Sequence, residues 1–151
     1  SLIATKVGEI RLVTCGSPEY FKGRTKPKTP QNLKSHDCVN IAALGTGKNW
    51  IFSDGKTKLS VPIKPRLEVS TVEAGLDAAA LGVGILRALS YQVASYQSRK
   101  QLEVILNNYE PTPWPVHLVY STGRIVPLKL RAFLDYAGPR LTQNLRNSPH
   151  R

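Results

Sequence analysis

Strand-like and helix-like patterns alternate along most of this chain, and this alternation constrains the fold more than any other feature. Residues 9–15 and 37–41 are predicted strands, because apolar residues alternate with polar ones or dominate there. Between them, Ser17 is a good N-cap and Pro18 suits the first position of a short helix. Strands interleaved with helices predict an α/β fold, with a mixed or parallel sheet flanked by helices.

The middle of the chain carries a predicted hairpin. Asp54 and Gly55 form its turn between strands at residues 50–52 and 58–64, and Pro65 is expected to end the second strand. The remaining predicted elements are strands at residues 66–69, 84–86, 102–106 and 116–120, helices at 74–81 and 91–99, a last helix opened by Pro127, and a frayed tail at 148–151.

Helix ends are marked by particular residues. Ser70 and Glu73 have the spacing of a capping box, and Ser90 is the expected cap of the helix at residues 91–99. Gly82 is expected to end the helix at residues 74–81, because glycine adopts a left-handed cap without strain.

The net charge of +11 over 151 residues is the strongest compositional signal. It invites an interaction with nucleic acid or with an anionic ligand. The cations, however, gather around two loops and along the C-terminal end, without interleaved aromatic residues. A solvated basic surface is the simpler interpretation, and direct nucleic-acid binding remains open as an alternative.

No catalytic, metal or cofactor signature is found in the sequence. Cys15 and Cys38 are expected to be buried and reduced, because they are too few for a disulfide framework and lack metal-ligand spacing. His36, Asp37 and Cys38 are adjacent on a predicted strand, so their side chains alternate sides and cannot converge. His117 and His150 lack visible partners, and no apolar stretch approaches the about 20 residues that span a bilayer. An enzyme and a membrane protein are therefore not expected.

The order of the motifs resembles the effector domain of bacterial LysR-type transcriptional regulators. The resemblance covers nearly the whole chain, through Ser17-Pro18-x-Tyr20, Thr29-Pro30-x-x-Leu33, His36-Asp37-Cys38, Trp50-x-Phe52, Val69-Ser70-Thr71-x-Glu73-Ala74, Gly82-Val83-Gly84-Ile85 and Arg131-Ala132-Phe133-Leu134-Asp135.

The resemblance implies a type II periplasmic-binding-protein-like fold, in which two α/β lobes are joined by two crossing strands. Residues 16–115 would form one complete lobe. Residues 1–15 and 116–151 would supply the crossing strands, near residues 11–15 and 116–120, and a remnant of the other lobe. The family's winged helix-turn-helix and the beginning of its first lobe have no counterpart here.

The candidate effector contacts are residues at strand ends, at the first crossing and at a helix start. Thr71 opens a helix whose N–H groups favour a carboxylate, and the family resemblance also points to it. The full set of candidates is Thr14, Gly16, Ser17, Ile41, Ala43, Leu44, Thr71, Gly84 and Ile85.

The expected function is that of a cytoplasmic sensor without a cofactor. A small-molecule effector, for which the basic balance makes an anion a candidate, would bind between the lobes and modulate DNA binding by a homo-oligomeric parent regulator. DNA would be contacted through the parent's missing N-terminal domain. The alternatives are a basic domain that binds nucleic acid directly and the solute-binding protein of a transporter.

Overall fold

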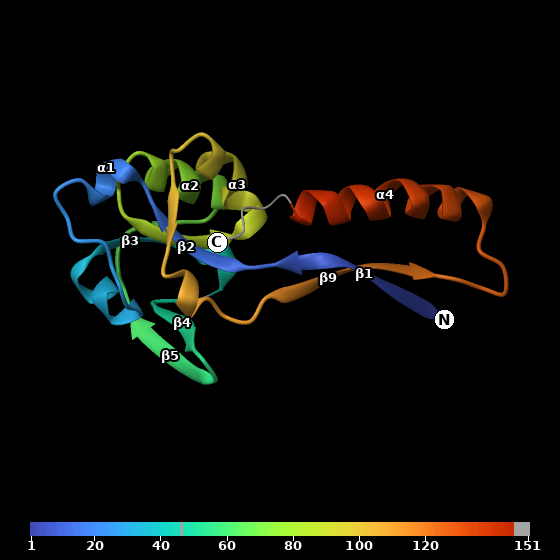
Figure 1. Cartoon of the computed structure of the whole chain (residues 1–151), viewed down its shortest axis with the longest axis horizontal. Helices are drawn as coiled ribbons and strands as arrows, with labels where there is room; N and C mark the ends of the chain where they lie inside the picture. The colour runs from blue at the N-terminus through green and yellow to red at the C-terminus, as the bar shows by residue number, and fades with distance from the viewer. Residues whose placement is uncertain (46, 147–151) are drawn as a thin grey trace.

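The computed structural model describes residues 1–45 and 47–146 of the chain. They form a lobe built on a five-stranded sheet, from which a two-stranded ribbon and a long C-terminal helix extend (Figure 1). The predicted tail at residues 148–151, with His150, lies outside the described residues.

The sheet of the lobe is mixed, which is one of the two arrangements that the alternation of strands and helices predicts. Its order is β6-β3-β7-β2-β8. Strand β3 runs parallel to β6 and β7, whereas β2 runs antiparallel to β7 and β8. These strands are β2 (Leu12–Gly16), β3 (Asp37–Ile41), β6 (Lys64–Val69), β7 (Ile85–Leu89) and β8 (Glu103–Ile105).

Two buried clusters cover the two faces of this sheet, because neighbouring residues on a strand point to opposite sides. Cys38 joins the cluster beneath the hairpin β4–β5, whereas Val39 joins the cluster beneath α2 and α3. The covering elements are α1 (Pro18–Phe21), β4 (Asn49–Asp54), β5 (Thr57–Pro62), α2 (Val72–Ala80) and α3 (Ser90–Ser98), with short 3₁₀ turns η1 (Pro30–Ser35), η2 (Ala42–Leu44) and η3 (Asn107–Tyr109).

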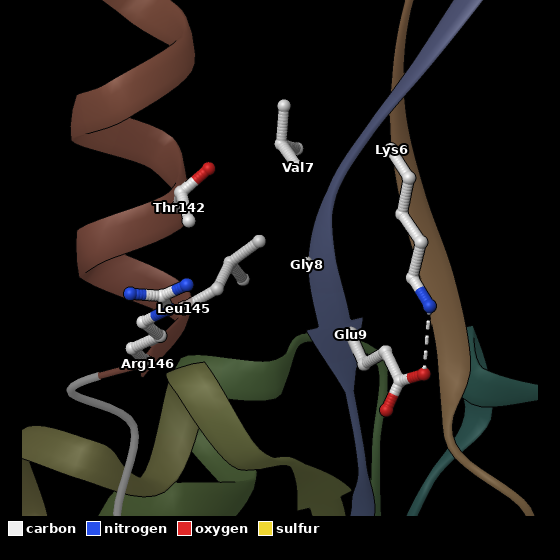
Figure 2. A pocket seen from close by; sticks show the side chains of 7 residues that line it. All are labelled: Lys6, Val7, Gly8, Glu9, Thr142, Leu145 and Arg146. Atoms are coloured by element: carbon white, nitrogen blue, oxygen red, sulfur yellow. Dashed lines mark hydrogen bonds and ion pairs between the residues drawn. The ribbon is translucent and has the colours of Figure 1, made fainter.

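The second part of the molecule is thin. Strands β1 (Leu2–Ile10) and β9 (Trp114–Ser121) pair antiparallel, and α4 (Leu128–Arg146) packs against β1. Figure 2 shows part of the contact between α4 and β1, where Leu145 faces Gly8 beside a pocket of about 360 Å³. The side chain of Phe133 in α4 is 58% exposed.

The predicted strand at residues 9–15 is wrong as a single element. The chain breaks at Arg11 into β1 and β2, and β2 lies inside the sheet between β7 and β8. The sheet of the lobe therefore begins at Leu12, before the predicted boundary at residue 16. Arg11 separates the strands because its backbone turns to α3: the Ser90 N–H donates to the Arg11 carbonyl at 2.8 Å, and the Arg11 N–H donates to Ser90 Oγ at 3.1 Å.

Two predicted element boundaries, at Pro65 and at Ser90, are also wrong. Pro65 does not end a strand but lies inside β6, and Lys64, predicted as the last residue of the preceding strand, begins β6. The sheet tolerates this proline because β6 is an edge strand, where a missing N–H need not cost a ladder bond. Ser90 is the first residue of α3, and its hydroxyl binds Arg11 instead of capping the helix.

Other local predictions are confirmed. The Tyr20 N–H donates to Ser17 Oγ at 3.0 Å, so Ser17 caps α1. Gly82 follows α2 with a φ of +86°, the left-handed conformation that favours glycine after a helix.

Candidate ligand site at the carboxyl edge of the sheet

One edge of the five-stranded sheet gathers strand ends that an α/β fold commonly uses for ligands. The parallel strands β3, β6 and β7 finish there at Ile41, Val69 and Leu89, and the antiparallel β2 begins there at Leu12, opposite Leu89. We call this the carboxyl edge. Ligands of open α/β sheets bind outside the carboxyl ends of the strands, and the β1–β9 ribbon leaves the lobe at the same edge, where Ile10 pairs with Trp114.

Four of the sequence-predicted residues lie at the carboxyl edge. Thr71 and Ala43 are exposed, Leu44 is half-buried, and Ile41 is buried in the core. The first three are accessible to a ligand, whereas Ile41 can act only by supporting η2.

Gly16, Ser17, Gly84 and Ile85 lie at the opposite edge and are buried. Their position follows from the antiparallel pairing of β2 with β7. Leu12 pairs with Leu89 at the carboxyl edge, and Cys15 pairs with Leu86 toward the opposite edge. The end of antiparallel β2 therefore meets the beginning of β7. Thr14 is buried in the middle of β2. The structure does not bring these five residues together with Thr71, and sequence order alone hides the reversal of β2.

The helix start at the carboxyl edge is capped by Thr71. The Ala74 N–H donates to Thr71 Oγ1 at 3.3 Å, and α2 begins at Val72. The predicted capping box of Ser70 and Glu73 is wrong by one residue: β6 ends at Val69 as predicted, but the residue that caps α2 is Thr71 and not Ser70.

Thr71→Ala is expected to lower the free energy of unfolding by about 1 kcal/mol, because the Ala74 N–H loses its acceptor. Ser70→Ala is the matched control and is expected to change it by less than about 0.5 kcal/mol. Urea denaturation followed by circular dichroism measures both. Equal losses for the two variants would contradict the assignment of the cap.

A pocket of about 630 Å³ opens at the carboxyl edge, between the hairpin, η2 and the segment that leads into β9. Leu44 is its one predicted site residue. The other lining residues are not indicated by the sequence patterns and are Leu12, Gly45, Asn49, Ile51, Lys58, Arg87, Pro111, Thr112 and Trp114.

Arg87 is the unusual member of this lining. It lies within β7 and is only 3% exposed, with its guanidinium carbon 4.4 Å from the centre of the Phe52 ring and 5.8 Å from that of Trp50. Burial lowers the pKa of Arg87 to about 10, and nearby Glu110 opposes that shift. Arg87 therefore stays charged at neutral pH. A cation within a short apolar strand was the available sequence signal.

A second arginine, Arg11, forms an ion pair with Glu110, the carboxylate near Arg87. Arg11 Nε lies 3.1 Å from Glu110 Oε2, and both side chains are largely buried. With the two hydrogen bonds between Arg11 and Ser90, this ion pair ties the start of the ribbon to α3 and to the segment before β9.

His36 makes a structural contact at the opposite edge. Its Nδ1 lies 2.9 Å from the Tyr20 hydroxyl, whose oxygen also accepts the Asp37 N–H at 3.0 Å. Burial lowers the pKa of His36, which favours the neutral ring. This arrangement joins α1 to β3. Among residues 1–45 and 47–146, no group of three or more His, Cys, Asp or Glu side chains could hold a metal ion.

The described part of the chain contains no helix that is both long and apolar enough to cross a membrane.

Both cysteines are free and buried, as predicted. Burial raises the pKa of Cys15 and of Cys38 to about 12, so at pH 8 about one thiol in 10,000 is ionised. Because the thiolate is the nucleophile, we expect Ellman's reagent to label neither residue within minutes in the native protein and both in 6 M guanidinium chloride. Rapid labelling of the native protein would contradict the described burial.

Comparison with known families gives one match that spans most of the chain. Residues 1–142 match the family model of the LysR substrate-binding domain. Among curated proteins, the chain is 28% identical over 152 residues to the uncharacterized HTH-type transcriptional regulator YcaN of Escherichia coli, covering 98% of this chain and 49% of YcaN. It is 25% identical over 145 residues to the regulator CrgA of Neisseria meningitidis, covering 95% of this chain and 48% of CrgA. The chain thus spans about half the length of these relatives.

Solved structures support the same fold. The regulatory domain of AphB from Vibrio vulnificus superposes with a TM-score of 0.82 at 24% identity, covering 90% of this chain and 68% of that domain. The CrgA regulatory domain gives 0.72 at 25% identity, covering 95% of this chain and 69% of that domain.

Proposed function

This chain belongs to the family of LysR substrate-binding domains, and we propose on that premise that it senses a small-molecule effector for a bacterial transcriptional regulator. The observation that carries the proposal is the family match across residues 1–142. The family comprises regulator domains and is not an enzyme family, and we propose that the chain itself catalyses no reaction.

We place the effector at the carboxyl edge, against Thr71, Ala43 and Leu44. These residues support the proposal because they are at least partly accessible and lie where the ribbon leaves the lobe. A ligand held there would contact both parts of the molecule, and its different contacts in open and closed arrangements would shift the equilibrium between them.

In the parent protein, this shift would alter DNA binding by a homo-oligomer in the cytoplasm. Support comes from relatives that are named HTH-type regulators and are about twice as long as this chain. DNA would be contacted by a part that this chain does not contain.

A metabolite screen tests the effector proposal. We expect at least one small molecule to raise the melting temperature of the chain and to bind saturably in calorimetry. Thr71→Val is expected to weaken that binding by about three- to tenfold through loss of one hydroxyl contact, whereas Ser70→Ala should not. Absence of any binder to this chain and to the full-length gene product would contradict the proposal.

The net charge of +11 favours a second candidate, direct binding of duplex DNA by this chain. Gel shifts at 25 and 150 mM salt (roughly the range over which phosphate contacts weaken) separate the two. Retardation at low salt that vanishes at high salt would support direct binding. No retardation at low salt would exclude it.

A further inference from the structure

Two nitrogens of the buried Arg87 guanidinium have no hydrogen-bond acceptor among the described residues. Phe52 and Trp50 interact with it through their rings, but the N–H groups lie in the guanidinium plane and need acceptors at its edges. Nε and Nη2 are buried and have no hydrogen-bond partner among the described residues. A buried charge whose N–H groups lack acceptors is costly. We therefore ask which external group could supply the acceptors that the described side chains do not.

The neighbouring carboxylate does not balance the charge. Glu110 forms an ion pair with Arg11 at 3.1 Å, and it interacts with Arg87 over a longer range. Two guanidiniums thus share one carboxylate in this part of the structure. The excess of positive charge, in a region of low dielectric, favours entry of one negative charge.

The pocket beside Arg87 has room for more than an inorganic ion. Leu12, Ile51 and Trp114 supply apolar walls, while Asn49, Thr112 and Lys58 offer polar groups. At about 630 Å³ its volume falls in the range of small-molecule sites. An anion with an apolar body would use both kinds of surface.

We propose that this pocket binds a small organic carboxylate, with the carboxylate on Arg87 and the apolar body against Ile51 and Trp114. Arginine suits a carboxylate because its donors match the two oxygens in one plane. Inorganic phosphate fits less well, because it has no apolar body to cover Leu12, Ile51 and Trp114. The inference rests on the proposed sensing function and gives its ligand a chemical class.

Phenylacetate is the probe that tests this inference in the intact 151-residue chain. In ¹H–¹⁵N spectra we expect it to shift the Arg87 Nε–H resonance saturably, with calorimetry giving the affinity. Phenylacetamide, which has the same body without the charge, and inorganic phosphate, which has the charge without the body, should each bind at least tenfold more weakly. Equal binding of phenylacetamide or of phosphate would overturn the proposed class, as would absence of a saturable shift.

Variants locate the site. Arg87→Met keeps the length of the side chain and should weaken phenylacetate binding at least tenfold. Lys58→Ala should weaken it about threefold, whereas Lys56→Ala, which removes an exposed cation from the turn of the same hairpin, should leave it unchanged. If Arg87→Met does not fold, the Nε–H titration and the two lysine variants still decide. Equal affinities for the Lys58 and Lys56 variants would contradict the placement.

Failure of this inference can be told from failure of the sensing function. If a metabolite from the screen binds in a Thr71-dependent manner and Arg87→Met leaves its affinity unchanged, the inference is wrong and the sensing function stands. If no effector binds but phenylacetate still shifts Arg87, the site stands without the sensing function.

Discussion

Trp50→Ala is expected to lower the free energy of unfolding by about 3–5 kcal/mol, the range for truncating a large aromatic side chain in a core. Trp50 is 1% exposed and belongs to the cluster beneath the hairpin. Its Nε1–H donates to Asn40 Oδ1 at 3.5 Å, and Arg87 lies over its ring. The variant therefore leaves a cavity and removes contacts from two buried polar side chains.

The chain offers its own control, because Trp114 is the second of its two tryptophans and is 50% exposed. Trp114→Ala is expected to cost less than about 1.5 kcal/mol. Guanidinium denaturation followed by circular dichroism compares the variants, and the fluorescence of the remaining tryptophan provides a second probe. Similar losses for both variants would show that the hairpin does not bury Trp50 in solution.

Gly84→Ala is expected to lower the free energy of unfolding by about 1–3 kcal/mol, through overpacking. A Cβ at this position would lie 2.6 Å from the Asp37 carbonyl oxygen and 2.8 Å from its carbon. Both are backbone atoms of β3, which pairs directly with β7. The steric clash can therefore be relieved only if the two strands separate locally, because the clashing atoms belong to the backbone and not to a flexible side chain.

Gly123→Ala is the matched control, since a Cβ there meets no atom within 4 Å. It is expected to leave stability unchanged or to raise it slightly, by up to about 1 kcal/mol, because alanine restricts the unfolded chain. Thermal and urea denaturation measure both variants. A Gly84→Ala protein as stable as the wild type would contradict the close approach of β3 and β7.

Short-range features were predictable wherever the interaction was local. The cap of α1 by Ser17 and the glycine end of α2 involve residues three or fewer positions from the helix terminus, so the chain itself specifies them. Pro65 shows the limit of such reasoning. Whether a proline breaks a strand depends on which neighbour lies beside it, and the position of β6 at the sheet edge is a long-range property.

The candidate site depended even more on long-range order. Gly84 and Thr71 are predicted from sequence to share one cleft, but Gly84 comes directly before β7, which runs parallel to β3, and therefore lies at the edge opposite Thr71. Arg87 was missed because a single cation in an apolar run says nothing about its partners. Only the packing of the hairpin over β7 shows that Phe52 and Trp50 cover it, while Nε and Nη2 meet no acceptor among the described residues.

The alternation of strands and helices by itself determined the class of this fold, because period-2 and period-3.6 patterns and their end signals are local. The motif order also pointed to the family. Only the tertiary structure decided which strand ends share an edge, that the five-stranded sheet includes β2 from Leu12, and that a buried cation lies beside a pocket. Those facts depend on pairings between residues far apart in the chain, which local patterns do not encode.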